Sequence, residues 1–252
     1  MNNPQVVIIT GAARGIGFGI ATCFARQGAK IVVADVDGTS ADRAAEELKK
    51  LGAGGAIGAA CDVSDRAAIS ATLDKTIQAF GGVDVLVNNA GICPFVDGMK
   101  MTPEVWRRTL DVNLTGAWNC TQIIGKRMIE QKTGGRVVCI TSLSENLSNG
   151  AQVDYAASKS GLRMMTVSFA TSLGRKGITC NCVAPGHIIT DMTRHHWETP
   201  GPAEEIKKRV PVGRIGTPED IGHVVVFLAS PQAEYINGIT IRVDGGFQAC
   251  CV

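Results

Sequence analysis

Tyr155 and Lys159 have the side chains and the spacing for transferring a proton. They lie four residues apart in a segment with helical periodicity, so the phenol and the ammonium are expected on one helix face. A phenol has a pKa of about 10 and is a poor base at neutral pH unless a positive charge stabilises the phenolate. Lys159 is placed to supply that charge. The same pair also occurs on solvated helix faces, so the spacing alone leaves a purely structural role open.

A glycine-rich turn near the start of the chain is predicted to bind a pyrophosphate. An apolar run of strand length, residues 5–10, leads into Gly11, Gly15 and Gly17, and a helical pattern extends from Ile16 to about residue 27. Glycines let the backbone approach an anion closely, and the start of a helix offers N–H groups without partners. A buried strand, a turn and a helix in this order therefore form an anion site.

Asp35 ends a second apolar run, residues 30–34, about 20 residues past the glycines. An acidic side chain there can accept hydrogen bonds from an adenosine ribose, and its charge would repel a 2′-phosphate. The pattern therefore favours NAD over NADP. Arg14 could instead accommodate a 2′-phosphate, or it could be only a solvated turn residue. Asp35 outweighs it, because two anions repel strongly in a partly dehydrated pocket.

Further motifs follow in order along the chain. They are Asp62 and Val63 after the third apolar run, Asn89-Ala90-Gly91 after the fourth, Asn113 in Asp-Val-Asn-Leu, Ser142 thirteen residues before Tyr155, and Pro185-Gly186 followed by Thr190. Together with the glycine turn and the Tyr-Ala-Ala-Ser-Lys segment, they resemble the short-chain dehydrogenase/reductase family. The resemblance covers essentially the whole chain.

The resemblance implies hydride transfer between a carbinol carbon and a nicotinamide, with four catalytic residues. Tyr155 would exchange the proton, Lys159 would favour the phenolate and bind the nicotinamide ribose, Ser142 would hydrogen-bond the substrate oxygen, and Asn113 would hold a water. The residues expected to bind the NAD cofactor are Gly11, Arg14, Gly15, Ile16, Gly17, Asp35, Asp62, Val63, Asn89, Ala90, Gly91, Tyr155, Lys159, Pro185, Gly186, Ile188 and Thr190.

The order of apolar and helical segments predicts an α/β architecture. Apolar runs near residues 5–10, 31–35, 56–61, 83–88, 135–141, 178–184 and 238–243 alternate with segments of helical period. Such alternation predicts a doubly wound parallel sheet of about seven strands with helices on both faces. We expect one NAD(P)-binding Rossmann domain over residues 1–252, with a substrate lid at about 187–211.

Composition indicates a cytoplasmic enzyme with a small-molecule substrate. The net charge of +2 is too small and too dispersed to indicate a nucleic-acid or membrane partner. No apolar run approaches the roughly 20 residues of a membrane span, and no signal peptide is recognised. Six of the nine cysteines lie in apolar segments, where a free thiol behaves as a core residue: Cys23, Cys61, Cys120, Cys139, Cys180 and Cys182. No metal site is expected, since His195 and His196 have no ligand cluster to complete one.

The substrate is expected to be hydroxylated. The stretch after the Asn-Asn-Ala-Gly element, residues 91–95, looks like that of some bacterial sugar dehydrogenases of the family, and polar residues are frequent before Tyr155 and in the lid. A sugar, polyol or sugar acid fits these features better than a steroid or a long acyl chain. The candidate substrate-binding residues are Ser142, Ser144, Asn149, Gln152, His187, Arg194, His196 and Trp197, with Arg194 or His196 as a contact for an anion.

Two other functions share these motifs. A 3-oxoacyl-thioester reductase would carry all of them, but such enzymes usually use NADPH, which Asp35 disfavours. A dinucleotide-binding regulator without turnover would not need Asn113, Ser142, Tyr155 and Lys159 together. The family resemblance also implies a homotetramer, and the segment from 103 to 131 has apolar residues at helical spacing for such an interface: Trp106, Leu110, Leu114 and Trp118. Those residues could equally serve only the sheet.

Overall fold

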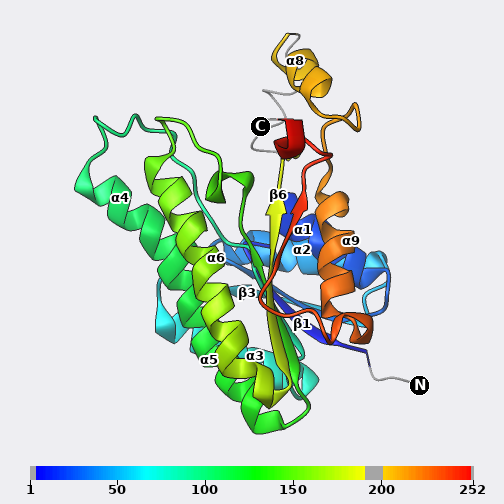
Figure 1. Cartoon of the computed structure of the whole chain (residues 1–252). Helices are drawn as coiled ribbons and strands as arrows, with labels where there is room; N and C mark the ends of the chain where they lie inside the picture. Colours follow the sequence, from blue (N-terminus) through cyan, green and yellow to red (C-terminus); the bar gives the residue numbers. More distant parts are fainter. Residues whose placement is uncertain (1–3, 191–200, 251–252) are drawn as a thin grey trace.

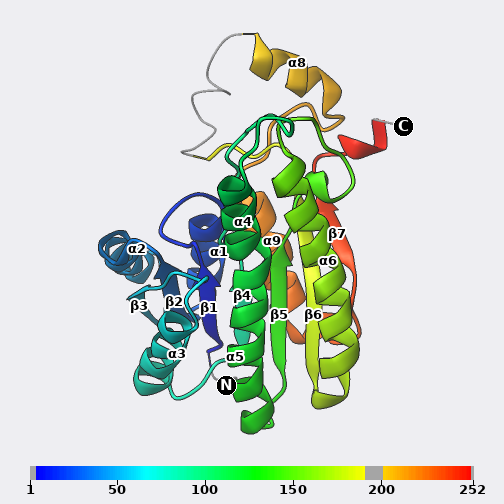
Figure 2. The ribbon, with the colours of Figure 1, turned by 90° about the vertical axis from the view of Figure 1, so that its left-hand side faces the viewer.

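The structure is a computed structural model and describes residues 4–190 and 201–250. In these ranges seven strands form one sheet in the order β3-β2-β1-β4-β5-β6-β7, and every neighbouring pair is parallel. Figure 1 shows the sheet nearly edge-on with helices on both of its sides, and Figure 2 shows the strands side by side in this order. The strands are β1 (Val6–Thr10), β2 (Lys30–Asp35), β3 (Gly55–Ala60), β4 (Val85–Asn88), β5 (Gly135–Ile140), β6 (Ile178–Pro185) and β7 (Thr240–Val243). The predicted parallel sheet is confirmed.

The central strands are buried on both faces, as their continuous apolar sequences predict. All five residues of β1 and all eight of β6 are buried. Helices α1 (Gly15–Ala25), α2 (Gly38–Lys50) and α9 (Pro218–Ala229) pack in one apolar core. Helices α3 (Arg66–Phe80), α5 (Gly116–Gln131) and α6 (Val153–Leu173) pack in the other. Figure 2 shows α5 and α6 running along the sheet, with α4 (Pro103–Leu110) above α5.

The segment from 103 to 131 is not one regular helix. Between α4 and α5 lies a π-helical turn, Asp111–Thr115, in which the Gly116 N–H donates to the carbonyl of Asp111 five residues earlier. The wider turn adds a residue to the helical repeat and so changes the direction in which its side chains point. Asn113 lies in this turn and is fully buried.

Within residues 201–211 of the segment expected to form the lid, the structure describes the helix α8 (Pro202–Arg209). Ile206 of α8 and the following Val210 pack against Leu143 and Phe247, so the helix is attached to the loop after β5 and to the C-terminal segment. No helix in the described ranges is both long and apolar enough to cross a membrane.

Candidate active site

The four expected catalytic residues come from three neighbouring elements. Ser142 follows β5 and begins a short 3-10 turn, Leu143–Glu145. Tyr155 and Lys159 lie in the first two turns of α6, and Asn113 lies in the π-helical turn. The carboxyl ends of parallel strands meet at one edge of the sheet, and this edge is where α/β folds bind their ligands.

The Ser142 hydroxyl lies close enough to Tyr155 to affect the titration of the phenol. Burial raises the pKa of Tyr155 to about 12, while the Ser142 hydroxyl opposes that rise. The hydroxyl of Ser142 also accepts a hydrogen bond of 3.1 Å from the Ser144 backbone N–H. The phenol therefore keeps its proton at neutral pH.

Lys159 is almost completely buried beside Tyr155. Its ammonium nitrogen lies 5.6 Å from the centroid of the Tyr155 ring and donates a hydrogen bond of 2.8 Å to the Ile140 carbonyl. Burial lowers the pKa of Lys159 to about 8, because the charged form loses its hydration. At neutral pH the residue therefore still carries its positive charge next to the phenol.

Asn113 connects α6 to the chain that follows β4. Its amide accepts from the Ile92 N–H at 2.8 Å and donates to the Ile92 carbonyl at 2.9 Å and to the Ser158 hydroxyl at 3.0 Å. A Cβ added to Gly91 would lie 3.3 Å from the Asn113 side-chain oxygen and 3.4 Å from the Lys159 nitrogen. A side chain at Gly91 would therefore press against both residues.

The glycine turn has the geometry of a phosphate cradle. Gly11 and Gly15 have φ of +62° and +59°, a region that favours glycine. A Cβ on Gly17 would lie 2.4 Å from the Gly11 carbonyl oxygen, so α1 can start this close to β1 only with glycine there. Ile16 packs on the adjacent apolar core, and the Arg14 side chain is exposed.

Asn89 fastens the end of β4 to the end of β1. Its side-chain nitrogen donates to the carbonyls of Thr10 and Gly11, both at 2.9 Å. The Thr10 hydroxyl in turn accepts from the N–H groups of Asn89 and Ala90 at 3.0 and 3.1 Å. β1 and β4 are the strands between which the strand order reverses, the position where doubly wound sheets bind dinucleotides.

Two carboxylates lie at the ends of the next two strands. Asp35 accepts hydrogen bonds from the Ala13 N–H at 3.1 Å and from the Asp37 N–H at 3.2 Å, which fixes it beside the glycine turn. Asp62 accepts from Ser64, which lowers the pKa of that carboxyl, and it pairs with Arg108 at 3.3 Å. The expected neighbour Val63 is buried.

The segment after β6 closes the other side of this edge. A Cβ on Gly186 would lie 2.7 Å from the Cα of Asp244, so the chain turns tightly after Pro185. Ile188 is buried and pairs with Gly216, and Thr190 lies against Gly15, with its Cβ 3.7 Å from the position of an added Gly15 Cβ. The expected cofactor residues from both ends of the chain therefore surround one region, and its glycine cradle and fixed Asp35 fit a dinucleotide.

Three of the expected substrate residues have contacts in the described part of the chain: Asn149, Gln152 and His187. The Gln152 side chain donates to the Cys93 sulfur at 3.5 Å and accepts from the Asn149 amide at 3.0 Å. His187 contacts the Phe247 ring edge-on, with centroids 4.7 Å apart. Arg194, His196 and Trp197 lie outside the described residues.

Cys93 and Ser158 belong to the site but are not among the sequence-based candidates. The charge of a Cys93 thiolate would interact with both Tyr155 and Lys159, and burial raises the pKa of its thiol. Ser158 receives the Asn113 hydrogen bond and donates to the Tyr155 carbonyl at 2.7 Å. The four-residue spacing of Asp154 and Ser158, one residue before Tyr155 and Lys159, is the sequence signal that could have drawn attention to a second polar face.

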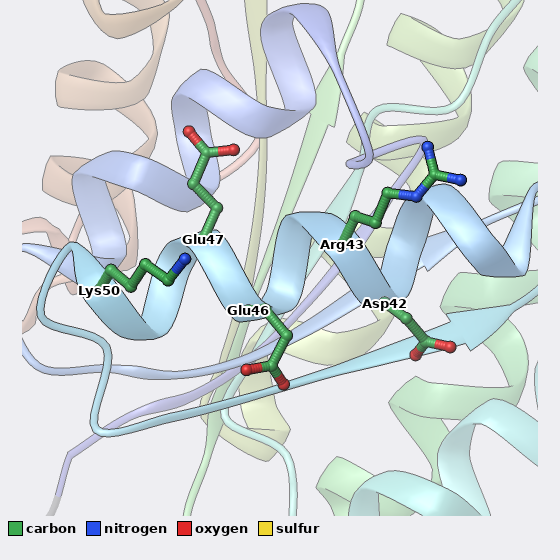
Figure 3. A pocket seen from close by; sticks show the side chains of 5 residues that line it. All are labelled: Asp42, Arg43, Glu46, Glu47 and Lys50. Atoms are coloured by element: carbon green, nitrogen blue, oxygen red, sulfur yellow. The ribbon is translucent and has the colours of Figure 1, made fainter.

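A surface depression over α2 is unrelated to this site. Its lining side chains all come from one helix: Asp42, Arg43, Glu46, Glu47 and Lys50. Figure 3 shows Asp42 and Glu46 on one side of α2 and Arg43 and Glu47 on the other. The side chains do not converge, so the depression is a solvated helix surface.

Comparisons with known proteins establish the class to which this fold and site belong. A family model described as enoyl-(acyl carrier protein) reductase matches residues 11–248. L-Rhamnose 1-dehydrogenase (NAD(P)+) of Azotobacter vinelandii is 40% identical over 247 residues, with 96% of each chain covered. A 3-oxoacyl-acyl-carrier-protein reductase of Synechocystis is 39% identical over 244 residues, again with 96% of each chain covered. The crystal structure of gox2181 has a TM-score of 0.92 at 35% identity and covers 98% of this chain and 97% of its own.

The chain belongs to the short-chain dehydrogenase/reductase family, as its motifs predict. It is an oxidoreductase that acts on CH–OH groups. The similar relatives include both sugar dehydrogenases and acyl-thioester reductases, so the family membership leaves the substrate to be decided by the site.

Proposed function

We propose that the protein is an NAD-dependent dehydrogenase of a sugar, polyol or sugar acid, with Tyr155 as its acid and base. The observation that carries this proposal is the polar cluster beside Tyr155, in which Asn149, Gln152 and Cys93 are joined by hydrogen bonds. Amide groups at this position can exchange their mutual hydrogen bonds for those of substrate hydroxyls. A substrate with several hydroxyls would use them; an acyl chain would leave them unpaired at a cost in free energy.

In the proposed reaction Tyr155 moves the proton. During oxidation its phenolate accepts the proton of the substrate alcohol, and during reduction its phenol donates one. Ser142, which lies close to Tyr155, positions the substrate oxygen beside the phenol. Lys159 holds a positive charge near the ring and so lowers the free energy of the phenolate. The nicotinamide cofactor, when bound, supplies hydride acceptance and donation.

The name of the Azotobacter relative favours an aldose such as L-rhamnose, oxidised at its anomeric carbon, as the first substrate to test. The expected anion contacts, Arg194 and His196, would extend the range to acidic sugars. Ser144 and His187 remain candidates for the same pocket, since one adjoins Ser142 and the other lies in the turn after β6.

NAD is the proposed cofactor because Asp35 ends β2 beside the glycine turn, where an adenosine ribose is expected to bind. Two backbone N–H groups hold its carboxylate beside the glycine turn, so it cannot swing away from a 2′-phosphate without losing them. Arg14 is the nearest candidate for a compensating cation, and its side chain is exposed rather than ordered by a partner in the described region.

A spectrophotometric screen tests the proposal against its alternatives. NAD+ and NADP+ are each combined with aldoses including L-rhamnose, polyols and sugar acids, and NADH and NADPH with acetoacetyl thioesters. We expect NAD+-linked oxidation of a hydroxylated substrate. Activity only with NADPH and the thioester would identify an acyl-thioester reductase instead. Tight binding of NADH without any turnover would indicate a dinucleotide-binding regulator.

We also propose a cytoplasmic homotetramer built on the outer face of α5 and α6. Trp118 is 40% exposed there and borders an apolar hollow with Leu114, Thr115 and Met165. A second copy covering this hollow would bury the indole. Light scattering of the wild-type protein and of W118E tests the proposal. We expect W118E to have a lower molar mass, and W106E, which changes a residue of α4 outside the lining of this hollow, to have a smaller effect.

A further inference from the structure

Two buried side-chain hydrogen bonds join α4 and the π-helical turn to α6. In the first, the Thr109 hydroxyl donates to the Asp154 carboxylate at 2.6 Å. In the second, the Asn113 amide donates to the Ser158 hydroxyl at 3.0 Å. Thr109 and Asn113 are four residues apart, as are Asp154 and Ser158, so the two bonds are stacked about one helical turn apart. We call this pair of bonds the ladder.

The ladder involves the residues of α6 that adjoin Tyr155 and Lys159 in sequence. Asp154 and Ser158 each precede a catalytic residue by one position, Tyr155 and Lys159 respectively. The Asn113–Ser158 bond has an expected role, because Asn113 is an expected catalytic residue. The Thr109–Asp154 bond has no assigned role, although it lies beside Tyr155.

Asp154 is an unusual residue to find at this position. Its exposed fraction is 0%, as is that of Thr109, and its Oδ1 has no hydrogen-bond partner among the described residues. A buried carboxylate with an unsatisfied oxygen costs free energy, so a fold retains one only where something offsets the cost. The short 2.6 Å bond is typical of a hydroxyl donating to an ionised carboxylate. The first turn of α6 also stabilises a negative charge there.

We propose that Asp154 is a positioning residue of the reaction: held by Thr109, its carboxylate fixes the first turn of α6, and its negative charge opposes loss of the proton from Tyr155. The inference rests on the proposed role of Tyr155. Lys159, from the next turn of α6, then favours the phenolate form of Tyr155. Asp154, the adjacent residue, disfavours it.

Other titratable groups also face the reacting pair. Cys93, from the chain after β4, faces Asp154, Tyr155 and Lys159; Cys139 from β5 and Cys182 from β6 face Lys159. Burial raises the pKa of all three thiols, so they are neutral at pH 7.

The first test follows the ionisation of Tyr155 without any substrate. The chain contains two tyrosines, and Tyr235 is 100% exposed, so a Y235F background leaves one tyrosinate signal in the near-ultraviolet spectrum. D154N keeps the size of the side chain and an acceptor for Thr109 but removes the charge. We expect ionisation of Tyr155 about 0.5 to 1 pH unit lower, seen as an about three- to tenfold larger tyrosinate fraction at an alkaline pH where the fold is intact.

D111N is the matched control, because it removes one exposed carboxylate from the π-helical turn. It is expected to leave the tyrosinate fraction unchanged. Equal tyrosinate fractions in D154N and its parent would overturn the proposal. If the wild-type protein oxidises no alcohol, the proposed function fails while this titration still tests Asp154.

The second test separates positioning from stability through the donor. T109V matches threonine in shape but cannot donate, whereas T109S can. With an active substrate, we expect T109V to lower kcat about tenfold with little change in KM for NAD+, and T109S to restore kcat. Equal kcat values for T109V and T109S overturn the positioning role, and this pair decides the matter if D154N does not fold.

Discussion

The Lys159 ammonium donates a 2.8 Å hydrogen bond to the carbonyl of Ile140, the last residue of β5, and this bond sets the position of the charge relative to Tyr155. The nitrogen lies 5.6 Å from the centroid of the Tyr155 ring. The site thus holds a buried cation that donates its hydrogen bond, among the described residues, to a neutral carbonyl. Such an arrangement is costly for folding and suits a residue whose charge is needed by a reaction.

Replacing Lys159 by methionine is predicted to stabilise the fold and abolish turnover. Burial lowers the pKa of Lys159 from 10.5 to about 8, so keeping it charged costs free energy below pH 8. Part of this gain is offset by the unpaired Ile140 carbonyl, so K159M should raise the free energy of unfolding at pH 7 by about 1–2 kcal/mol. The advantage should disappear between pH 8 and 10.5, where wild-type Lys159 becomes neutral in the folded and then in the unfolded state. Urea unfolding measures this difference in the free energy of unfolding, and K176M, which changes an exposed lysine, is the control.

Removing the phenol hydroxyl is predicted to remove catalysis without removing cofactor binding. Tyr155→Phe leaves the ring in place but deletes the hydroxyl that lies close to Ser142. We expect kcat to fall by about 10³-fold or more, since proton transfer loses its acid and base. Fluorescence titration should give an NADH affinity close to that of the wild type. Y235F, which changes the other tyrosine, should retain full activity, and a Y155F enzyme with most of its kcat would refute the assignment.

The charge of Asp35 is predicted to decide between NAD and NADP. D35N retains an acceptor for the Ala13 N–H and removes the charge. The ratio of kcat/KM for NADP+ to that for NAD+ should rise at least about tenfold, which corresponds to about 1.4 kcal/mol of relieved repulsion. D37N, two residues away at an exposed position, should leave the ratio near the wild-type value. An unchanged ratio in D35N would mean that the ribose lies elsewhere.

The buried thiols are predicted to make the protein unstable in alkali. Burial raises the pKa of seven cysteines above the ordinary value of 9.0: Cys23, Cys61, Cys93, Cys120, Cys139, Cys180 and Cys182. Above pH 9 the unfolded chain releases these protons while the folded protein retains them, so the free energy of unfolding falls as pH rises. Lys159 has the opposite effect. Its lowered pKa makes the folded protein release one proton before the unfolded chain does, so this residue raises the free energy of unfolding between pH 8 and 10.5.

Urea unfolding at several pH values above 9, under reducing conditions, measures this dependence. When the buried Cys120 is replaced by alanine, the decline of the free energy of unfolding with pH should become shallower by about 1.4 kcal/mol per pH unit, which corresponds to one proton. Replacing the exposed Cys250 by alanine should not change the slope. A free energy of unfolding that stays level between pH 9 and 11 would contradict the prediction.

The strands could be predicted from sequence because each is a short apolar run between helical segments. The run Val6–Thr10 and the run Ile178–Pro185 are buried along their whole length, which is the pattern of a parallel sheet covered on both faces. The π-helical turn at Asp111–Thr115 could not be predicted in this way. Its residues continue the helical pattern of the flanking segments, so no local signal marks the extra residue in the turn.

The site could be predicted only in part. Gly11, Gly15, Asn89, Ser142, Tyr155 and Lys159 are recognisable because their motifs are local, and the structure brings them to one edge of the sheet. The Thr109–Asp154 bond joins residues 45 positions apart, and no spacing within either segment indicates it. The pKa of Tyr155 is likewise set by how deeply three elements bury it, which a sequence motif does not specify.

The position of β1 in the sheet has a consequence for the growing polypeptide. β1 pairs with β2 on one side, only about 24 residues later in the chain, but on its other side it pairs with β4, where Val7 lies opposite Val85. A nascent chain that ends before β4 therefore carries an apolar central strand with an open hydrogen-bonding edge. Such edges recruit other strands, so synthesis of this protein includes an interval in which a half-made sheet is open to aggregation until β4 arrives.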